Sequence, residues 1–255
     1  MVNLFYEMNK KEKIIILLIV LIFAGILLYG LISIILLPSY QTIIERTEKI
    51  YKENVINLPE PKTKGEMSVE EALLKRRSIR EYTSQPLNLE QISQLLWAAQ
   101  GITEPRLGFR TAPSAGATYP LEIYLVVGEK GVEKLEAGIY KYNPHEHSII
   151  LLLKGDFRKE LMGAGLGQTW IGEAPINIVI VAIYERTTSR YGERGIRYVH
   201  MEAGHVGQNI YLQATALKLG TVVIGAFYDE EVQKVLNLPK EEKPLYIMPV
   251  GYPRK

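Results

Sequence analysis

Cysteine is absent from the 255-residue sequence, and histidine occurs only four times. Without cysteine the chain cannot form disulfides, dithiol redox centres, thiolate nucleophiles or cysteine-ligated iron–sulfur clusters. Any redox chemistry of this protein must therefore be carried by a bound cofactor. The formal net charge is +2, and no block of lysine and arginine with interleaved aromatic residues occurs, so we expect no nucleic acid partner.

Sequence motifs of several enzyme classes are missing as well. The chain has no Gly-x-Ser-x-Gly elbow, no Walker loop and no Gly-x-Gly-x-x-Gly after an expected strand, which leaves hydrolase, nucleoside triphosphatase and Rossmann interpretations without support. His200, Glu202 and His205 fall on one expected helix. The two histidines would point about 140° apart, whereas a zinc-binding His-Glu-x-x-His motif needs both on one face. We therefore expect no metal site.

A long hydrophobic run, by contrast, is present near the N-terminus. Residues 14–37 form a stretch of 24 positions without a charge, rich in isoleucine and leucine. As a helix this stretch would be about 36 Å long, enough to cross a hydrocarbon core of about 30 Å. It exceeds the apolar core of a signal peptide, and no small-x-small cleavage pattern follows it. The sequence thus predicts a retained single-pass transmembrane anchor in a lipid bilayer.

The charges beside this run predict its orientation. Lys10, Lys11 and Lys13 abut it on the N-terminal side, which favours a cytoplasmic N-terminus and a globular domain outside. Basic residues on the other side alternate with glutamates, so the side of the membrane that holds the domain stays open. Behind the anchor, Ser39–Val55 has the apolar spacing of an amphipathic helix, and two prolines and a glycine then mark a linker. The expected organisation is an N-terminal tail (1–13), an anchor (14–37), a helical stalk and linker (38–65) and one globular domain (66–255).

The globular part mixes helices and strands without the strict alternation of βαβ units, which indicates the α+β class. Ser68 and Asn88 have the side chains of helix N-caps, and each precedes apolar residues at helical spacing. Apolar, β-rich runs bounded by turn residues predict the strands. The expected helices are 69–77, 89–100, a short helix capped by Asp156 that ends near 164, 196–219 and 229–236, and the expected strands are 121–127, 138–142, 148–153, 176–184, 221–227 and 245–252.

Two short segments carry the chemistry. Arg76-Arg77-Ser78-Ile79-Arg80 gathers three guanidiniums and a hydroxyl, and the planar fork of a guanidinium suits a phosphate. Pro113–Pro120 is a turn of small residues, where backbone can approach a flat ligand. Taken singly, the arginines could be solvated cations at a helix C-terminus, and the turn could be a plain connection. Together they indicate a bound organic phosphate with a planar ring, which is a nucleotide or a flavin.

These segments occur in order with three others: Glu202–Asn209, Leu219–Ala226 and Pro249–Pro253. With this set of motifs the chain resembles the FMN-dependent, nitroreductase-like oxidoreductases, and more closely their thiazole/oxazole dehydrogenase (SagB-type) branch. The likeness spans about residues 67–255. It implies an α+β fold with a central, mainly antiparallel sheet flanked by helices, and a homodimer with FMN at the interface.

The resemblance also implies which residues hold the cofactor. Arg76, Ser78 and Arg80 would bind the phosphate and the ribityl chain, with Arg254 as a further candidate for the phosphate. Four residues would approach the isoalloxazine, from the partner subunit: Pro113, Ser114, Ala115 and Ala117. The other side of the ring would be lined by a second set, whose backbone donors would lie near its electron-accepting edge: Val223, Ile224, Gly225 and Ala226.

Azoline-oxidising relatives use a Lys-Tyr pair for proton removal, and the nearest counterpart here is Arg190-Tyr191. Arginine is a poor proton acceptor because it stays charged, so peptide heterocycle oxidation is not favoured. Tyr191 remains a candidate catalytic acid or hydrogen-bond donor, and the alternative is an exposed loop tyrosine. The expected function is two-electron transfer through flavin N5 between NAD(P)H or another organic donor and a small or peptidic acceptor. The alternative is a non-catalytic flavin-binding or dimerisation module at the membrane.

Overall fold

The computed structural model describes residues 54–254. The described residues belong to one compact unit, Asn54–Lys255. The expected tail, the anchor at 14–37 and the stalk helix up to Glu53 lie outside the described residues. No helix within residues 54–254 is long and apolar enough to cross a membrane.

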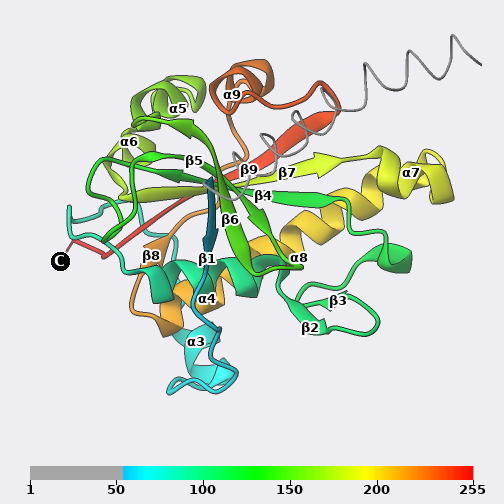
Figure 1. Cartoon of the computed structure of the whole chain (residues 1–255), viewed down its shortest axis with the longest axis horizontal. Coiled ribbons are helices and arrows are strands. Elements are labelled where there is room, and N and C mark those ends of the chain that lie inside the picture. Colours follow the sequence, from blue (N-terminus) through cyan, green and yellow to red (C-terminus); the bar gives the residue numbers. More distant parts are fainter. Residues whose placement is uncertain (1–53, 255) are drawn as a thin grey trace, which may run out of the picture. The chain divides into compact units, whose positions relative to one another are not determined.

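A seven-stranded sheet runs through the middle of this unit (Figure 1). Its strand order is β1-β6-β5-β4-β7-β9-β8, and every pair of neighbours is antiparallel. The expected α+β fold with a mainly antiparallel sheet is therefore confirmed. The strands of the sheet are β1 (Val55–Asn57), β4 (Leu121–Val127), β5 (Gly138–Asn143), β6 (Ser148–Lys154), β7 (Ile176–Ile183), β8 (Gly220–Thr221) and β9 (Glu242–Gly251), and a separate hairpin joins β2 (Ile102–Glu104) to β3 (Phe109–Arg110).

Helices cover both faces of this sheet (Figure 1). α4 and α8 pack on one face together with α3, whereas α5, α6 and α9 lie on the other. The sheet therefore separates two hydrophobic cores. The helices are α3 (Val69–Lys75), α4 (Leu89–Gln100), α5 (Arg158–Ala164), α6 (Thr169–Glu173), α7 (Glu185–Tyr191), α8 (Arg194–Ala216) and α9 (Asp229–Val235), with a 3₁₀ turn at Ala115–Ala117.

The two cores explain the sequences of the central strands. Neighbouring residues of β4 belong to opposite cores, since Leu125 packs on the side of α4 and α8 and Val126 on the side of α5 and α9. This alternation is the period of two that a strand imposes. β7 lies between β4 and β9 and is buried along almost its whole length. A strand covered on both faces needs the unbroken apolar run that the sequence has there.

Capping side chains begin two helices as expected. Ser68 caps α3, and Asn88 begins α4 with a complete capping box. The prediction that Asp156 is the N-cap of the next helix is wrong by one residue. Phe157 is the N-cap of α5, and the Asp156 carboxylate binds the backbone N–H and the guanidinium of Arg158 from just outside the helix.

Two expected boundaries are wrong. The strand expected at 221–227 is limited to β8, after which the chain leaves the sheet edge and meets β9 again where Ile224 pairs with Ile247. The apolar residues beyond β8 therefore pack in the hydrophobic core, and apart from the Ile224 bridge they do not pair as a strand. Val55, expected at the end of the stalk helix, instead begins β1, which pairs with β6.

The linker that follows β1 is fastened to the domain. His147, in the turn between β5 and β6, has its Nε2 atom 2.7 Å from the Ser93 hydroxyl and 3.1 Å from the Pro59 carbonyl oxygen. The backbone N–H of Lys62 donates to the Gln94 side chain (2.8 Å). β1 and the residues behind it are thus packed with the sheet, although the sequence pattern predicts them outside the globular domain.

Candidate functional site

The arginine segment (residues 76–80) leaves α3 and runs beside β8. Arg76 is the C-cap of α3, and the backbone N–H of Ile79 donates to the Thr221 carbonyl oxygen (2.9 Å). The Arg76 guanidinium lies 5.0 Å from the ring centroid of Tyr211. The hydroxyls of Ser78 and Tyr211 share a hydrogen bond of 2.8 Å. The segment is therefore held against the C-terminal half of α8, which carries Tyr211.

Tyr211 is a residue of the site that sequence reasoning missed. Its hydroxyl also accepts a hydrogen bond from the backbone N–H of Val223 (2.9 Å). Tyr211 therefore joins the arginine segment to residues 223–226, which the resemblance assigns to another part of the same cofactor. The available signal was a tyrosine in an apolar helix, because a buried tyrosine hydroxyl needs a hydrogen-bond partner.

Within residues 223–226, Gly225 and Ala226 present small side chains and backbone donors. Ile224 turns its side chain into the core beside α9, and its backbone pairs with Ile247. Gly225 and Ala226 are exposed, and their backbone N–H groups have no acceptor within residues 54–254. Val223 is half-buried. A flat ligand can approach such a stretch closely and accept hydrogen bonds from it.

The C-terminus lies beside the arginine segment. The Nη2 atom of Arg254 donates to the Tyr82 carbonyl oxygen (3.0 Å), and the Arg80 guanidinium stands 5.7 Å from the ring centroid of Trp170. In the described part of the chain, Arg76, Arg80 and Arg254 have no carboxylate within ion-pair distance. A guanidinium without a carboxylate partner is available to bind a phosphate group.

The small-residue loop (residues 113–117) takes a backbone conformation that few residue types allow. Gly116 (φ 60°) and Ala117 (φ 54°) both lie in the left-handed region. A Cβ atom at Gly116 would stand 2.5 Å from the Tyr191 hydroxyl, so a larger residue does not fit without displacement. The residues that were expected to contact a flavin are all exposed or partly exposed: Pro113, Ser114, Ala115 and Ala117.

α7 brings Arg190 and Tyr191 to this loop. The Nη1 atom of Arg190 donates to the Gly116 carbonyl oxygen (3.1 Å). The rings of Tyr191 and Tyr198 pack edge-on, with 5.2 Å between their centroids. Tyr191 is half-buried at the last position of α7, so it is not an exposed loop residue.

Glu202 on α8 is the second residue that sequence reasoning missed as a site residue. It is 2% exposed, and its Oε1 atom has no hydrogen-bond partner in the described part of the chain. Burial raises the pKa of the Glu202 carboxyl to about 7, although Ser114, Gln100 and Arg110 act to lower it. His200 and His205 are exposed, so they do not share the buried face of α8 with Glu202.

Two half-sites therefore lie along α8. The arginine half-site consists of the arginine segment, Tyr211, Arg254 and residues 223–226, and the loop half-site consists of the small-residue loop, the end of α7 and Glu202. Glu202 and Tyr211 are nine positions apart, about 13.5 Å along the helix axis. Among the described residues no hydrogen bond or ion pair joins 76–80 to 113–117.

Comparison with known proteins gives a family and a fold. Residues 73–252 match the nitroreductase family. The chain is 55% identical over 186 residues to MJ1384 of Methanocaldococcus jannaschii, which is provisionally named a nitroreductase, and the match covers 73% of this chain and 91% of MJ1384. A crystal structure from Ralstonia eutropha JMP134, also provisionally described as a nitroreductase, has a TM-score of 0.70 at 32% identity and covers 79% of this chain and 90% of its own.

Two relatives are more distant. The microcin B17-processing protein McbC of Escherichia coli is 28% identical over 155 residues, which are 60% of this chain and 57% of McbC. An FMN reductase (NAD(P)H) of Bacillus subtilis is 25% identical over 196 residues, which are 71% of this chain and 64% of the reductase. The match to McbC agrees with the expected likeness to the SagB-type branch. Because the family match covers well over half of the chain and, except for Arg254, both half-sites, this protein belongs to the nitroreductase family.

Proposed function

We propose that this protein is a membrane-anchored oxidoreductase that transfers two electrons, as a hydride, between NAD(P)H or another organic donor and a small or peptidic acceptor. As a member of the nitroreductase family it is an FMN-dependent enzyme. The observation that carries the proposal is the arginine half-site, where Tyr211 joins Ser78 to the backbone of Val223. When bound, FMN supplies the redox chemistry, through N5, that a chain without cysteine cannot supply from its side chains.

The residues of the arginine half-site fit FMN. Arg76, Arg80 and Arg254 offer guanidiniums that no carboxylate in the described residues neutralises, and a phosphate monoester accepts hydrogen bonds from such groups. The backbone N–H groups of Gly225 and Ala226 can donate to the edge of a flat ring and stabilise negative charge that develops there. The chain therefore provides both the anchor for the phosphate and the donors for the ring.

The loop half-site completes the site from another copy of the chain. Within one chain, no hydrogen bond or ion pair of the described residues joins 76–80 to 113–117, and the family resemblance implies that the loop comes from a partner subunit. We infer a homodimer in which the small-residue loop of one protomer covers the flavin held by the other. The exposed and partly exposed residues of this loop are short enough for close contact: Pro113, Ser114, Ala115 and Ala117.

We assign proton donation to Tyr191. Its hydroxyl lies beside Gly116 in the small-residue loop, whereas the neighbouring Arg190 stays charged and is bound to that loop. In Tyr191→Phe we expect acceptor reduction to slow by about 10²-fold, as after loss of a general acid, with the flavin content unchanged. Tyr198→Phe changes the edge-on neighbour of Tyr191 and is the matched control, with the wild-type rate expected. Equal losses of rate in both variants would indicate a packing role and would rule out the assignment.

The membrane anchor is proposed from the length and the lack of charge of residues 14–37, which lie outside the described part of the chain. The lysines before it support a cytoplasmic N-terminus. We expect the full-length protein to stay with the membrane fraction after a carbonate wash. Release of the protein by that wash would contradict the anchor.

The same preparation tests the enzyme function. After extraction with detergent, the protein should be yellow, with the absorption bands of a flavin, and NADH or NADPH should bleach them. A colourless protein that cannot be reconstituted with FMN would contradict the proposal. A bound flavin that neither nicotinamide reduces would favour the alternative, a flavin-binding module without activity.

A further inference from the structure

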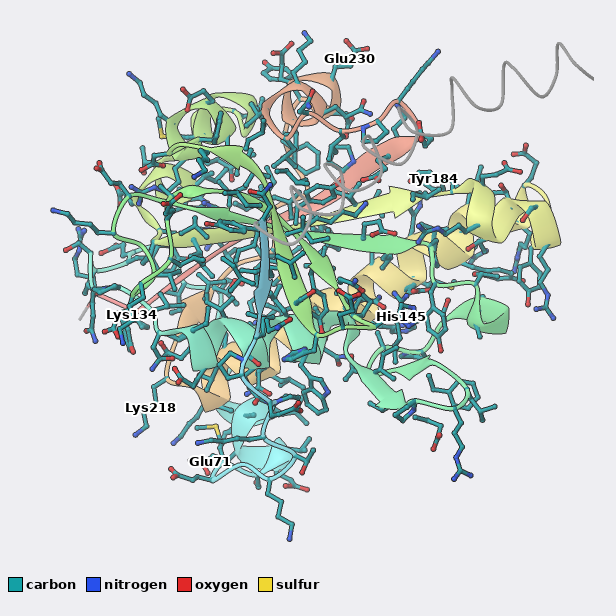
Figure 2. The ribbon with its side chains drawn as sticks, in the orientation of Figure 1. Glu71, Lys134, His145, Tyr184, Lys218 and Glu230 are labelled. Atoms are coloured by element: carbon teal, nitrogen blue, oxygen red, sulfur yellow. The ribbon has the colours of Figure 1, made fainter. Side chains whose placement is uncertain are left out.

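A cavity of about 480 Å³ lies next to the loop half-site, where β3, the start of β4 and the β5–β6 turn meet. Figure 2 shows His145 in that turn, on the side of the molecule where the β2–β3 hairpin lies, and His145 lines the cavity. Ligand pockets typically have volumes of about 300–1,000 Å³. Within the described residues, no member of the arginine half-site lines this cavity. It is therefore separate from the place proposed for the FMN phosphate.

Three cations line the cavity against one carboxylate, that of Glu122. Glu122 forms ion pairs with Lys141 (3.3 Å) and with Arg186. Lys141 is paired a second time, with the buried Glu242 (2.9 Å). The third cation, Arg110, has no carboxylate within ion-pair distance in the described part of the chain. The wall formed by Arg110 thus carries a positive charge that the protein leaves unpaired.

Arg110 is also fixed in place by its neighbours. Its Nη1 atom donates to Gln100 Oε1 (2.9 Å), and its guanidinium lies 4.5 Å from the ring centroid of Tyr119. Nε of Arg110 and Nε2 of Gln100 are buried and have no acceptor within hydrogen-bond distance in the described part of the chain, and the buried Glu202 carboxyl interacts electrostatically with both residues. Burial lowers the pKa of Arg110, although Glu122 and Glu202 act to raise it.

We propose that this cavity binds a small organic oxyanion, a carboxylate or a phosphate monoester carried on a planar body. The oxygens of such a group can accept hydrogen bonds from the Arg110 guanidinium and neutralise its charge. Tyr142 and Ile150 on the remaining walls suit an apolar or aromatic body. The volume far exceeds that of a bare ion, so the ligand is organic. This site goes beyond the proposed function, because it needs no residue of the arginine half-site.

Isothermal titration calorimetry on the full-length protein in detergent tests the proposal. FMN is added to saturation, so that the arginine half-site is filled, and the probes are benzoate, phenyl phosphate and the neutral benzamide. We expect at least one of the two anions to bind tenfold or more tightly than benzamide, and the tighter anion identifies the oxyanion. Benzamide binding as tightly as both anions, or no heat from either anion, overturns the proposal.

A variant pair locates the binding on Arg110. Arg110→Gln should weaken binding of the tighter anion at least tenfold, whereas Arg106→Gln, at the exposed turn of the same hairpin, should keep the wild-type affinity. Equal affinities in the two variants would place the anion elsewhere. If circular dichroism shows that Arg110→Gln is unfolded, the comparison of the anions with benzamide on the wild type still tests whether the cavity binds an oxyanion. Flavin absorbance of the same samples should not change, so loss of the anion site is distinguishable from loss of FMN.

Discussion

Replacing Arg76 and Arg80 together with alanine is expected to weaken FMN binding by about 10²- to 10³-fold. A hydrogen bond to a charged group contributes about 1.5–3 kcal/mol, and the solvent exposure of these guanidiniums places the loss toward the lower end of the sum. Riboflavin, which lacks the phosphate but keeps the ribityl chain, should lose much less affinity than FMN in the variant. Quenching of flavin fluorescence on titration with the apoprotein measures both affinities.

Lys75→Ala is the matched control for the arginine pair. Lys75 carries the same charge one position before Arg76, and it pairs with Glu71 at the surface of α3. Because a surface ion pair contributes little, FMN affinity should change less than about twofold in this variant. An equal loss of riboflavin and FMN in the double variant would show that the arginines support the fold of the site and do not bind the phosphate.

Glu202→Gln is expected to change how stability depends on pH. The pKa of Glu202 is about 7 in the folded protein, above the ordinary carboxyl value of 4.5. Between these values the folded state keeps a proton that the unfolded state releases, so the free energy of unfolding falls as pH rises toward and through 7. The full difference corresponds to about 3 kcal/mol, present below pH 4.5 and lost above pH 7. An amide carries no such proton, so the variant should lack this decline and be more stable than the wild type at pH 8.

Thermal unfolding followed by intrinsic fluorescence at pH 5, 6, 7 and 8 measures this difference. Other titrating groups contribute equally to the wild type and the variant, so the comparison isolates Glu202. Glu241→Gln, at an exposed position before β9, controls for the removal of a surface carboxylate. If the midpoint temperatures of all three proteins changed in parallel with pH, Glu202 would have an ordinary pKa and the buried carboxyl would not be the cause.

Local patterns in the sequence predicted most of the fold. The N-caps at Ser68 and Asn88, the alternation along β4 and the apolar run of β7 each depend on a few neighbouring residues, and each is confirmed. The strand expected at 221–227 failed because its apolar residues fill the core after the chain has left the sheet edge. β1 could not be predicted because three residues show no periodicity, and they form a strand only by pairing with β6.

The site was predictable where residue type alone carries the chemistry. Guanidiniums at 76 and 80 and small residues at 113–117 indicated a phosphate and a flat ring, and the resemblance supplied residues 223–226. Tyr211 could not be assigned to the site from the sequence because its partner Ser78 lies 133 positions earlier in the chain. Glu202 and Arg110 were missed for the same physical reason, since burial by elements distant in the sequence gives them their shifted pKa values.

The short strand β1 bears on how the domain can be shortened for study. Its three residues cover the outer edge of β6, and Val55 pairs with Ile150 and Asn57 with Ser148. A truncation that begins at residue 66 would uncover this edge and its row of unpaired backbone groups, which recruit further strands from neighbouring molecules. Versions of the protein without the N-terminal anchor should therefore retain β1, because those that lack it would tend to assemble edge to edge and aggregate.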